Sequence, residues 1–301
     1  MDLEVLALRI AHTPADPGVR ETRWKDILQG RKRADAEADV AAEVWEKLCG
    51  QLPYDVEAAW HAVPEMHALR SATAVNAHER DKVRDLIEEL CVDATLADGV
   101  VASRKARVAH KLHEESWSYS EIDAVFLFAV LLKLKRIHGH LRKRGTFVDC
   151  GSGFGKNAFV AAIAHPWQRI VGIEALDALC LGAEALLERF HDHTLPRLRS
   201  KDQGDRDDTD IEFVRGDFLT MDLVLTGTLI YADLTCLNSG QLVAFRALVD
   251  EVTHGTVVVT LTRPLLSEKF FLLWQEQAPT SWGHTQAFVW ERKPPPPEED
   301  P

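Results

Sequence analysis

The sequence predicts an α/β fold built on a mostly parallel sheet. From residue 145 onward, short apolar runs alternate with segments of helical periodicity, in the order strand, helix, strand, helix, strand, loop, strand, helix, strand. Such alternation favours right-handed crossovers and a parallel sheet. An acidic residue also stands at the end of four of the predicted strands. Because ligands of these sheets lie beyond the carboxyl ends of the strands, the acids mark the expected site.

The first predicted strand, residues 146–149, is followed by Gly151, Gly153 and Gly155 and then by an apolar helix over residues 157–164. Glycines allow the main chain to approach a ligand where a Cβ would collide, and the helix start offers free N–H groups. The second strand, residues 169–173, ends on Glu174. An acid at that position binds ribose hydroxyls in nucleotide-type sites.

Other glycine-rich motifs fit less well. A dinucleotide fingerprint needs a glycine at position 156, which is Lys156, and a P-loop needs Ser or Thr at position 157, which is Asn157. Asp149 and the three glycines resemble the first motif of class I S-adenosylmethionine methyltransferases. This resemblance implies a Rossmann-like fold, although an ordinary strand-to-helix turn would show the same glycines.

The later elements extend this unit. We expect helices at residues 119–134 (with Ser120 as N-cap), 177–190 and 241–252, and strands at 211–214, 228–231, 255–261 and 286–290, with a short apolar stretch at 270–274. Four acids converge on one rim of such a sheet: Asp149, Glu174, Asp217 and Asp233. They suit a ligand that carries hydroxyl and amino donors and positive charge.

The remainder of the chain divides into three parts. We expect an N-terminal α-helical region at residues 1–115, with helices near 34–49, 79–91 and 103–113, packed as a cap on the catalytic domain. The catalytic domain covers residues 116–293. The tail, residues 294–301, holds five prolines and three acids and cannot form a core.

Composition excludes several classes of protein. No apolar run approaches the roughly 18 residues of a membrane helix, no signal peptide opens the chain, and five scattered cysteines suggest a reducing compartment without a metal site. The net charge of −12 argues against nucleic-acid binding by the whole surface. The run 133–144 nevertheless holds six Lys or Arg residues. These either complement a helix C-terminus or dock phosphate or an acidic partner.

Six motifs together resemble one branch of methyltransferases. They are Trp117-Ser-Tyr119-Ser-Glu121, Phe147-Val-Asp-Cys-Gly-Ser-Gly-Phe-Gly155, Val171-Gly-Ile-Glu174, Arg215-Gly-Asp-Phe-Leu219, Thr262-Arg-Pro264 and Ser281-Trp282-Gly283. The chain is similar over residues 115–292 to the non-SET histone H3 lysine methyltransferases of the disruptor-of-telomeric-silencing family. The resemblance implies methyl transfer from S-adenosylmethionine to a lysine of histone H3 in nucleosomes, a nuclear location, and DNA contact through residues 133–144.

The resemblance also implies residue roles. Glu174 would hold the ribose, Asp217 and Phe218 the adenine, and the glycine turn the methionine part. The cofactor-binding set is Tyr119, Glu121, Asp149, Gly151, Ser152, Gly153, Gly155, Lys156, Asn157, Glu174, Asp217, Phe218 and Asp233. The expected catalytic residues are Asp233, which would orient the amine, with Tyr119 and Trp282 as walls of the lysine channel.

The chain departs from the family pattern at three places. The family has Asn-Asn-Phe-Ala-Phe where this chain has Ala232-Asp233-Leu-Thr-Cys236, a glycine where it has Ser120, and a glutamine where it has Lys156. These changes leave two alternatives open. The acceptor could be a non-histone protein or a small molecule, or the chain could be a non-catalytic subunit that binds S-adenosylmethionine.

Overall fold

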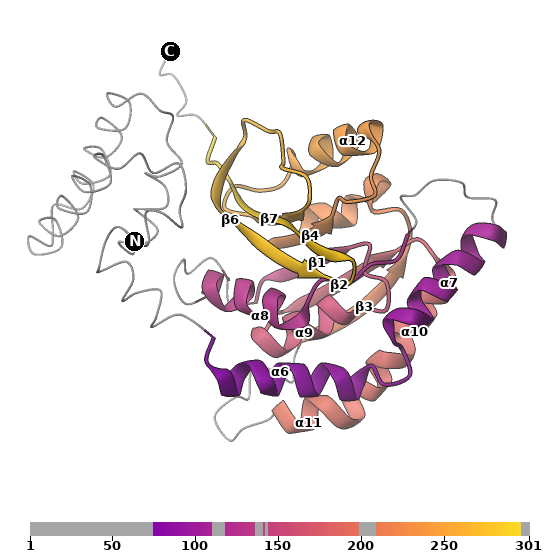
Figure 1. Cartoon of the computed structure of the whole chain (residues 1–301). Helices are drawn as coiled ribbons and strands as arrows, with labels where there is room; N and C mark the ends of the chain where they lie inside the picture. Colours follow the sequence, from indigo (N-terminus) through magenta and orange to yellow (C-terminus); the bar gives the residue numbers. More distant parts are fainter. Residues whose placement is uncertain (1–74, 110–117, 136–140, 142–143, 199–208, 296–301) are drawn as a thin grey trace, which may run out of the picture.

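The computed structural model describes residues 75–109, 118–135, 141, 144–198 and 209–295. In this part of the chain seven strands form one sheet in the order β3-β2-β1-β4-β5-β7-β6 (Figure 1). The strands are β1 Thr146–Cys150, β2 Arg169–Glu174, β3 Asp210–Arg215, β4 Leu229–Asp233, β5 Val257–Leu261, β6 Phe270–Thr280 and β7 Gly283–Arg292. Strands β1 to β5 pair in parallel, and β7 runs antiparallel to both β5 and β6. The predicted α/β fold with a mostly parallel sheet is therefore confirmed.

Helices cover both faces of the sheet. They are α6 Ala77–Leu90, α7 Leu96–Ala109, α8 Ala124–Lys133, α9 Lys156–Ala164, α10 Asp177–Arg189, α11 Leu195–Leu198 and α12 Ser239–Val249, with a π-helical turn Phe190–Thr194 before α11 and 3₁₀ turns Phe218–Thr220 and Asp222–Thr226. Helices α8, α9 and α10 pack on one face, and α12 with the 3₁₀ turns packs on the other (Figure 1). No helix in the described part is long and apolar enough to cross a bilayer.

Burial on both faces explains the continuous apolar character of the central strands. In β1, Phe147 points to the α8–α9 side and Val148 to the α12 side, and both are fully buried. Successive side chains of a strand point to opposite faces, so a doubly covered strand needs apolar residues at both. The strand order reverses between β1 and β4. This switch point is where an open α/β sheet leaves a crevice for a ligand.

Two helices from the predicted N-terminal region pack on this core. Helix α6 begins with a capping box between Asn76 and Glu79 and buries Val83, Leu86, Ile87 and Leu90 in the same core as α8 and α9. Helix α7 lies along α10 (Figure 1). The predicted helix at 34–49, the basic segments 136–140 and 142–143, the boundary at 115/116 and most of the tail lie outside the described residues, so the domain division stays a prediction.

The structure differs from the sequence prediction at several places. The helix expected near 103–113 is α7, which already begins at Leu96. Helix α8 begins at Ala124 with Asp123 as N-cap, because the Asp123 carboxylate accepts the Phe126 N–H at 2.8 Å. Ser120 is therefore free for another role. At the C-terminal end, the stretch expected to be short is the long hairpin β6–β7. Polar residues 275–277 and Pro279 hide β6 in the sequence, and they are tolerated because β6 is the edge strand.

Candidate active site

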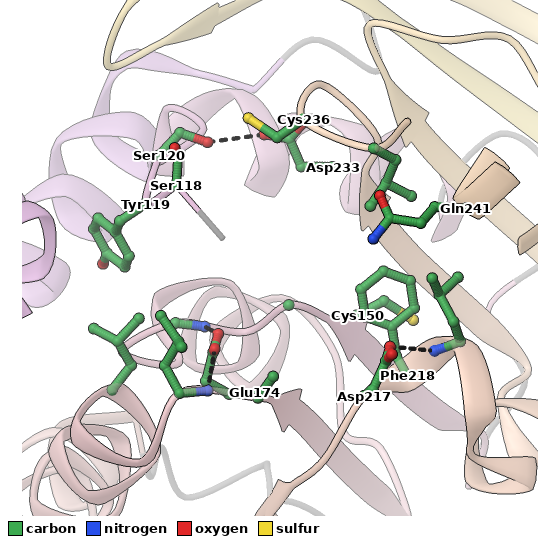
Figure 2. Close-up of a pocket in the computed structure, with 17 residues that line it drawn as sticks. Ser118, Tyr119, Ser120, Cys150, Glu174, Asp217, Phe218, Asp233, Cys236 and Gln241 are labelled. Carbon is green, nitrogen blue, oxygen red and sulfur yellow. Dashed lines mark hydrogen bonds between the residues drawn. The ribbon is translucent and has the colours of Figure 1, made fainter. Parts of the chain in front are cut away.

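A cavity opens at the carboxyl ends of β1, β2 and β4 (Figure 2). It is lined by Ser118, Tyr119, Ser120, Cys150, Gly151, Gly153, Glu174, Ala175, Leu176, Leu179, Asp217, Phe218, Leu219, Asp233, Cys236, Leu237 and Gln241. We call the residues that follow β1, β2 and β3 (Gly151, Gly153, Glu174, Asp217 and Phe218) the strand-end wall. Those of the facing loops (Ser118, Tyr119, Ser120, Asp233 and Cys236) are the loop wall. Three carboxylates and no Lys, Arg or His stand among the described lining residues, so the cavity suits a cationic ligand.

Glu174 anchors the strand-end wall. Its two carboxylate oxygens accept the N–H groups of Gly153 and Leu176, both at 2.8 Å. Burial raises the pKa of this carboxyl, while the main-chain hydrogen bonds act in the opposite direction. The Ala175 N–H also acts on this carboxylate, which leaves about one of its four acceptor sites, and Figure 2 shows the carboxylate at the cavity floor. This arrangement can accept hydroxyl donors from a ligand.

The glycine turn gives this wall its shape. Gly151 and Gly153 have φ angles of 82° and 55°, which glycine adopts without steric cost. The N–H groups of Gly151 and Ser152 both donate to the Ile173 carbonyl, so the turn is fastened to β2. A Cβ at Gly153 would lie 2.6 Å from the Tyr119 ring. The turn therefore leaves room both for a ligand and for the ring that covers it.

Asp217 and Phe218 complete the strand-end wall. The Asp217 carboxylate caps the following 3₁₀ turn by accepting the Leu219 N–H at 2.9 Å. The Phe218 ring meets Phe245 of α12 edge to face at 6.1 Å between centroids, which fixes its orientation. A planar apolar face beside a carboxylate is suited to an aromatic base with an exocyclic amine.

Tyr119 is the central residue of the loop wall. Its ring lies between Gly153 and Gly99 of α7, where an added Cβ would approach the ring to 2.2 Å. Its hydroxyl donates to Glu121 at 2.7 Å, and Glu121 also pairs with Lys156 at 2.7 Å. Burial and the Glu121 carboxylate raise the pKa of Tyr119, which keeps the phenol neutral. Helix α7 thus helps to position a residue of the cavity.

The loop that carries Tyr119 is attached to the β6–β7 turn. The Glu121 N–H donates to Ser281 Oγ, the Ser281 N–H to the Glu121 carbonyl, and the Asp123 N–H to the Pro279 carbonyl. Trp282, in the same turn, is 48% exposed and does not line the cavity. The expected role of Trp282 as a channel wall stays a prediction.

Asp233 joins the tyrosine loop to the end of β4. Ser120 Oγ donates to its Oδ2 at 3.0 Å, and the Thr235 N–H donates to Oδ1 at 2.9 Å (Figure 2 shows the Ser120 bond). The Thr235 hydroxyl donates to the same Oδ1. Ser120 and Asp233 are two of the three departures from the family pattern. In the structure these two departures contact each other directly.

The structure gathers about half of the predicted cofactor residues at one cavity. Tyr119, Gly151, Gly153, Glu174, Asp217, Phe218 and Asp233 line it. Ser152 and Gly155 are buried inside the turn. Glu121, Lys156 and Asn157 instead line a neighbouring hollow between the α6–α7 junction and the β6–β7 turn. None of these five lines the cavity, and their roles as cofactor contacts stay predictions.

Asp149 lies beneath the glycine turn and has no exposed surface. Its Oδ1 lies 3.5 Å from Asn157 Nδ2, and its Oδ2 has no hydrogen-bond partner among the described residues. Burial raises the pKa of this carboxyl to about 7. The sequence analysis expected Asp149 on the rim with the other three acids, but the structure buries it outside the cavity lining, because its side chain points below the turn.

Five lining residues that carry a hydroxyl, thiol or amide group were not among the predicted site residues: Ser118, Ser120, Cys150, Cys236 and Gln241. Gln241 had a signal, because Asn238-Ser-Gly-Gln241 is a capping box in which the Asn238 N–H donates to Gln241 Oε1 at 2.9 Å. That bond fixes the amide orientation, and Figure 2 shows the nitrogen directed into the cavity.

The fold, the glycine turn and the acidic cavity define a class I methyltransferase that uses S-adenosylmethionine. Similar solved structures include an RNA methyltransferase from Salinibacter ruber in complex with S-adenosyl-L-homocysteine (21% identity, TM-score 0.40, 57% of this chain and 94% of that chain). A second is a putative RNA methyltransferase from Pyrococcus horikoshii (10% identity, TM-score 0.41, 64% of this chain and 100% of that chain). A third is a methyltransferase from Geobacter sulfurreducens (15% identity, TM-score 0.39, 64% of this chain and 89% of that chain).

The family model described as histone methylation protein DOT1 matches residues 101–269, more than half of the 301-residue chain. The protein therefore belongs to the DOT1 histone methylation family, and its cofactor is S-adenosylmethionine. No curated protein matched the sequence. Gly99, which packs against the Tyr119 ring, lies just before the matched region.

Proposed function

We propose that this protein is a histone H3 lysine N-methyltransferase that acts on nucleosomes in the nucleus. Family membership supports the histone, and the loop wall supports an amine acceptor. The observation that carries the proposal is the cavity itself, which presents Glu174, Asp217 and Asp233 and no cationic side chain among its described lining residues. Both a sulfonium cofactor and a lysine amine match this charge.

The residues present fit the cofactor. We propose that the carboxylate of Glu174 accepts ribose hydroxyls and that Asp217 with Phe218 holds the adenine, because all three residues line the cavity. The turn at Gly151 and Gly153 offers a surface without side chains for the methionine part. When bound, S-adenosylmethionine would supply its methyl group to an acceptor amine by in-line displacement, in which the N–C bond forms as the S–C bond breaks and S-adenosylhomocysteine leaves. The protein mainly aligns the two, and orientation is worth roughly 7–11 kcal/mol in such reactions.

We propose that Asp233 orients the acceptor amine. A lysine has a pKa of about 10.4 and must lose a proton before it can attack. Exclusion of water by the Tyr119 ring and the apolar lining would lower the pKa of the amine, while the Asp233 carboxylate would act in the opposite direction. Asp233 has both oxygens fixed by Ser120 and Thr235, and it would accept a hydrogen bond from the amine. Asp233→Ala should reduce turnover by about 100-fold with the cofactor still bound; unchanged turnover would remove Asp233 from this role.

The acceptor can be identified by transfer of radiolabelled methyl from S-adenosylmethionine to intact nucleosomes, with free histones and histone-depleted lysate in parallel. The proposal expects label on a lysine of H3, located by mass spectrometry of the digested histone. Label only in the depleted lysate would replace the histone by another acceptor. Cofactor binding without transfer to any of the three would favour a non-catalytic subunit.

The described residues of the basic run 133–144, through which we propose a DNA contact, do not line the cavity. Lys133 at the end of α8 lies over the Trp274 ring at 4.5 Å, and Lys135 donates to the Ala164 carbonyl at 3.3 Å. Arg144 is exposed just before β1, at the amino edge of the parallel strands, whereas the cavity is at their carboxyl edge. We propose that this run contacts DNA at a distance from the reacting lysine. Arg144→Gln should weaken nucleosome binding and reduce its salt dependence; an unchanged salt slope would discard this contact.

A further inference from the structure

A chain of hydroxyl groups leads from β7 to Asp233. Thr285 Oγ1 lies 2.8 Å from Thr262 Oγ1, and Thr262 Oγ1 lies 2.7 Å from Thr235 Oγ1. The Thr235 hydroxyl donates to Asp233 Oδ1. Thr285 lies in β7, Thr262 directly after β5, Thr235 in the loop after β4, and Asp233 at the end of β4. Only Asp233, the last of them, lines the cavity.

The direction of each hydrogen bond in this hydroxyl chain follows from the number of protons that each group can donate. An ionised carboxylate only accepts hydrogen bonds, and each hydroxyl has one proton to donate. Because the Thr235 proton goes to Asp233, Thr262 must donate to Thr235, and Thr285 must donate to Thr262. All the O–H groups therefore point towards Asp233. Hydrogen bonds arranged head to tail polarise one another, which strengthens the last bond to the carboxylate.

Thr262 adopts a strained backbone conformation at the middle of this chain. Its φ is 66°, a value that is an outlier for a β-branched residue. Glycine would occupy this conformation without cost. The other non-glycine residue with positive φ in the described part is Arg144, which is exposed and unbranched. The strain at Thr262 is maintained by its main-chain bond to Gln286 and by its two hydroxyl contacts. Strain of this kind is found at functional sites.

We propose that Thr262 is a positioning residue, whose hydroxyl holds Thr235 and thereby fixes the Asp233 carboxylate at the cavity wall for methyl transfer. This inference rests on the proposed role of Asp233 in orienting an acceptor amine. Thr285 supports Thr262 from β7. A glycine would suit this backbone conformation better, but it would break the chain of hydroxyls.

Three substitutions of Thr262 separate a positioning role from a purely structural one. Thr262→Val keeps the branched shape and removes the hydroxyl. Thr262→Ser keeps the hydroxyl, and Thr262→Gly removes both the hydroxyl and the strain. Thr253→Val is the matched control, because it removes a hydroxyl from the Thr253–Thr256 pair at the opposite end of β5. For each variant, the turnover number at saturating cofactor and the dissociation constant of S-adenosylmethionine would be measured with the full chain.

The inference expects Thr262→Val and Thr262→Gly to lower turnover by about tenfold with cofactor affinity unchanged, and Thr262→Ser and Thr253→Val to stay near wild type. Wild-type turnover in Thr262→Gly would overturn the inference, because the backbone turn would then be sufficient for activity without the hydroxyl. Asp233→Ala is assayed alongside. Loss of turnover in Asp233→Ala with full turnover in all Thr262 variants would reject the hydroxyl chain and keep the proposed role of Asp233.

A readout without an acceptor keeps this test separate from the proposed function. The Thr235 N–H donates to the Asp233 carboxylate, which the hydroxyl chain also holds. Hydrogen exchange of this N–H therefore reports on how firmly the Asp233 carboxylate is held. Exchange in the 233–237 segment should be faster in Thr262→Val than in wild type, and Thr262→Ser should restore protection. Equal exchange in all variants would contradict the inference whatever the acceptor proves to be.

Discussion

The two walls of the cavity are stabilised by different kinds of contact. In the strand-end wall, Glu174 and the glycine turn are held by main-chain N–H groups from residues close to β1 and β2. In the loop wall, Ser120 and Asp233 are 113 residues apart and are joined by a side-chain hydrogen bond. The first wall depends on the local course of the strands. The second depends on side chains brought together by the whole fold, so single substitutions can change it without changing the sheet.

This difference suggests that the two walls have separate functions. The strand-end wall carries the residues that resemble those of other class I methyltransferases, and it would bind the cofactor. The loop wall carries Ser120 and Asp233, which depart from the family pattern, and it would determine how the acceptor is held. Substitutions in the two walls should therefore change different measurements.

The largest expected effect concerns Asp149 beneath the strand-end wall. Its pKa is raised to about 7 in the folded protein, whereas an unfolded chain has about 3.9. The folded state therefore binds more protons between these values, and this carboxyl makes stability fall as pH rises from about 4 to 7, by roughly 4 kcal/mol. Asp149→Asn should flatten this slope in chemical denaturation measured across that range. The same slope in both proteins would contradict the assignment.

The next effect concerns Gly99, which packs against the Tyr119 ring. Alanine is favoured over glycine inside a helix by about 1 kcal/mol, so Gly99→Ala would ordinarily stabilise α7. Here the new Cβ would meet the Tyr119 ring, and displacement of that ring should weaken S-adenosylmethionine binding by about tenfold in calorimetric titration. Gly240→Ala in α12 is the matched control, because its nearest contact would be 3.4 Å.

A second variant decides whether the Gly99 effect acts through Tyr119. In a Tyr119→Ala background the ring is absent, and Gly99→Ala should then leave cofactor affinity unchanged. If the tenfold loss persists in that background, α7 influences the site by another route.

The smallest expected effect concerns the Ser120–Asp233 bond. Ser120→Ala removes one partly buried donor to a carboxylate, a bond worth about 1.5–3 kcal/mol at most. Because Thr235 still holds Asp233, we expect turnover to fall only about threefold to tenfold, with no change in cofactor affinity. Initial rates at saturating cofactor check this. A larger change in cofactor affinity than in turnover would place Ser120 with the strand-end wall instead.

The sequence was informative where structure is local and less so where it is not. The glycine turn and the acids at strand ends follow from short motifs, and the cavity does form at those ends. The role of Ser120 was predicted wrongly, because a serine before a helix looks like a cap and its actual partner is distant. The long β6–β7 hairpin was hidden by polar residues that an edge strand tolerates. The hydroxyl chain joins residues that lie in or directly after β4, β5 and β7, and no spacing rule relates them.

The most direct test of the division between the walls is to measure cofactor affinity and turnover in Glu174→Gln and Asp233→Ala side by side. The account predicts that Glu174→Gln weakens S-adenosylmethionine binding by about 30-fold to 100-fold, as expected for lost charge-assisted hydrogen bonds. It predicts that Asp233→Ala leaves that affinity within about threefold of wild type while turnover falls by about 100-fold. Equal loss of cofactor affinity in both variants would contradict the account.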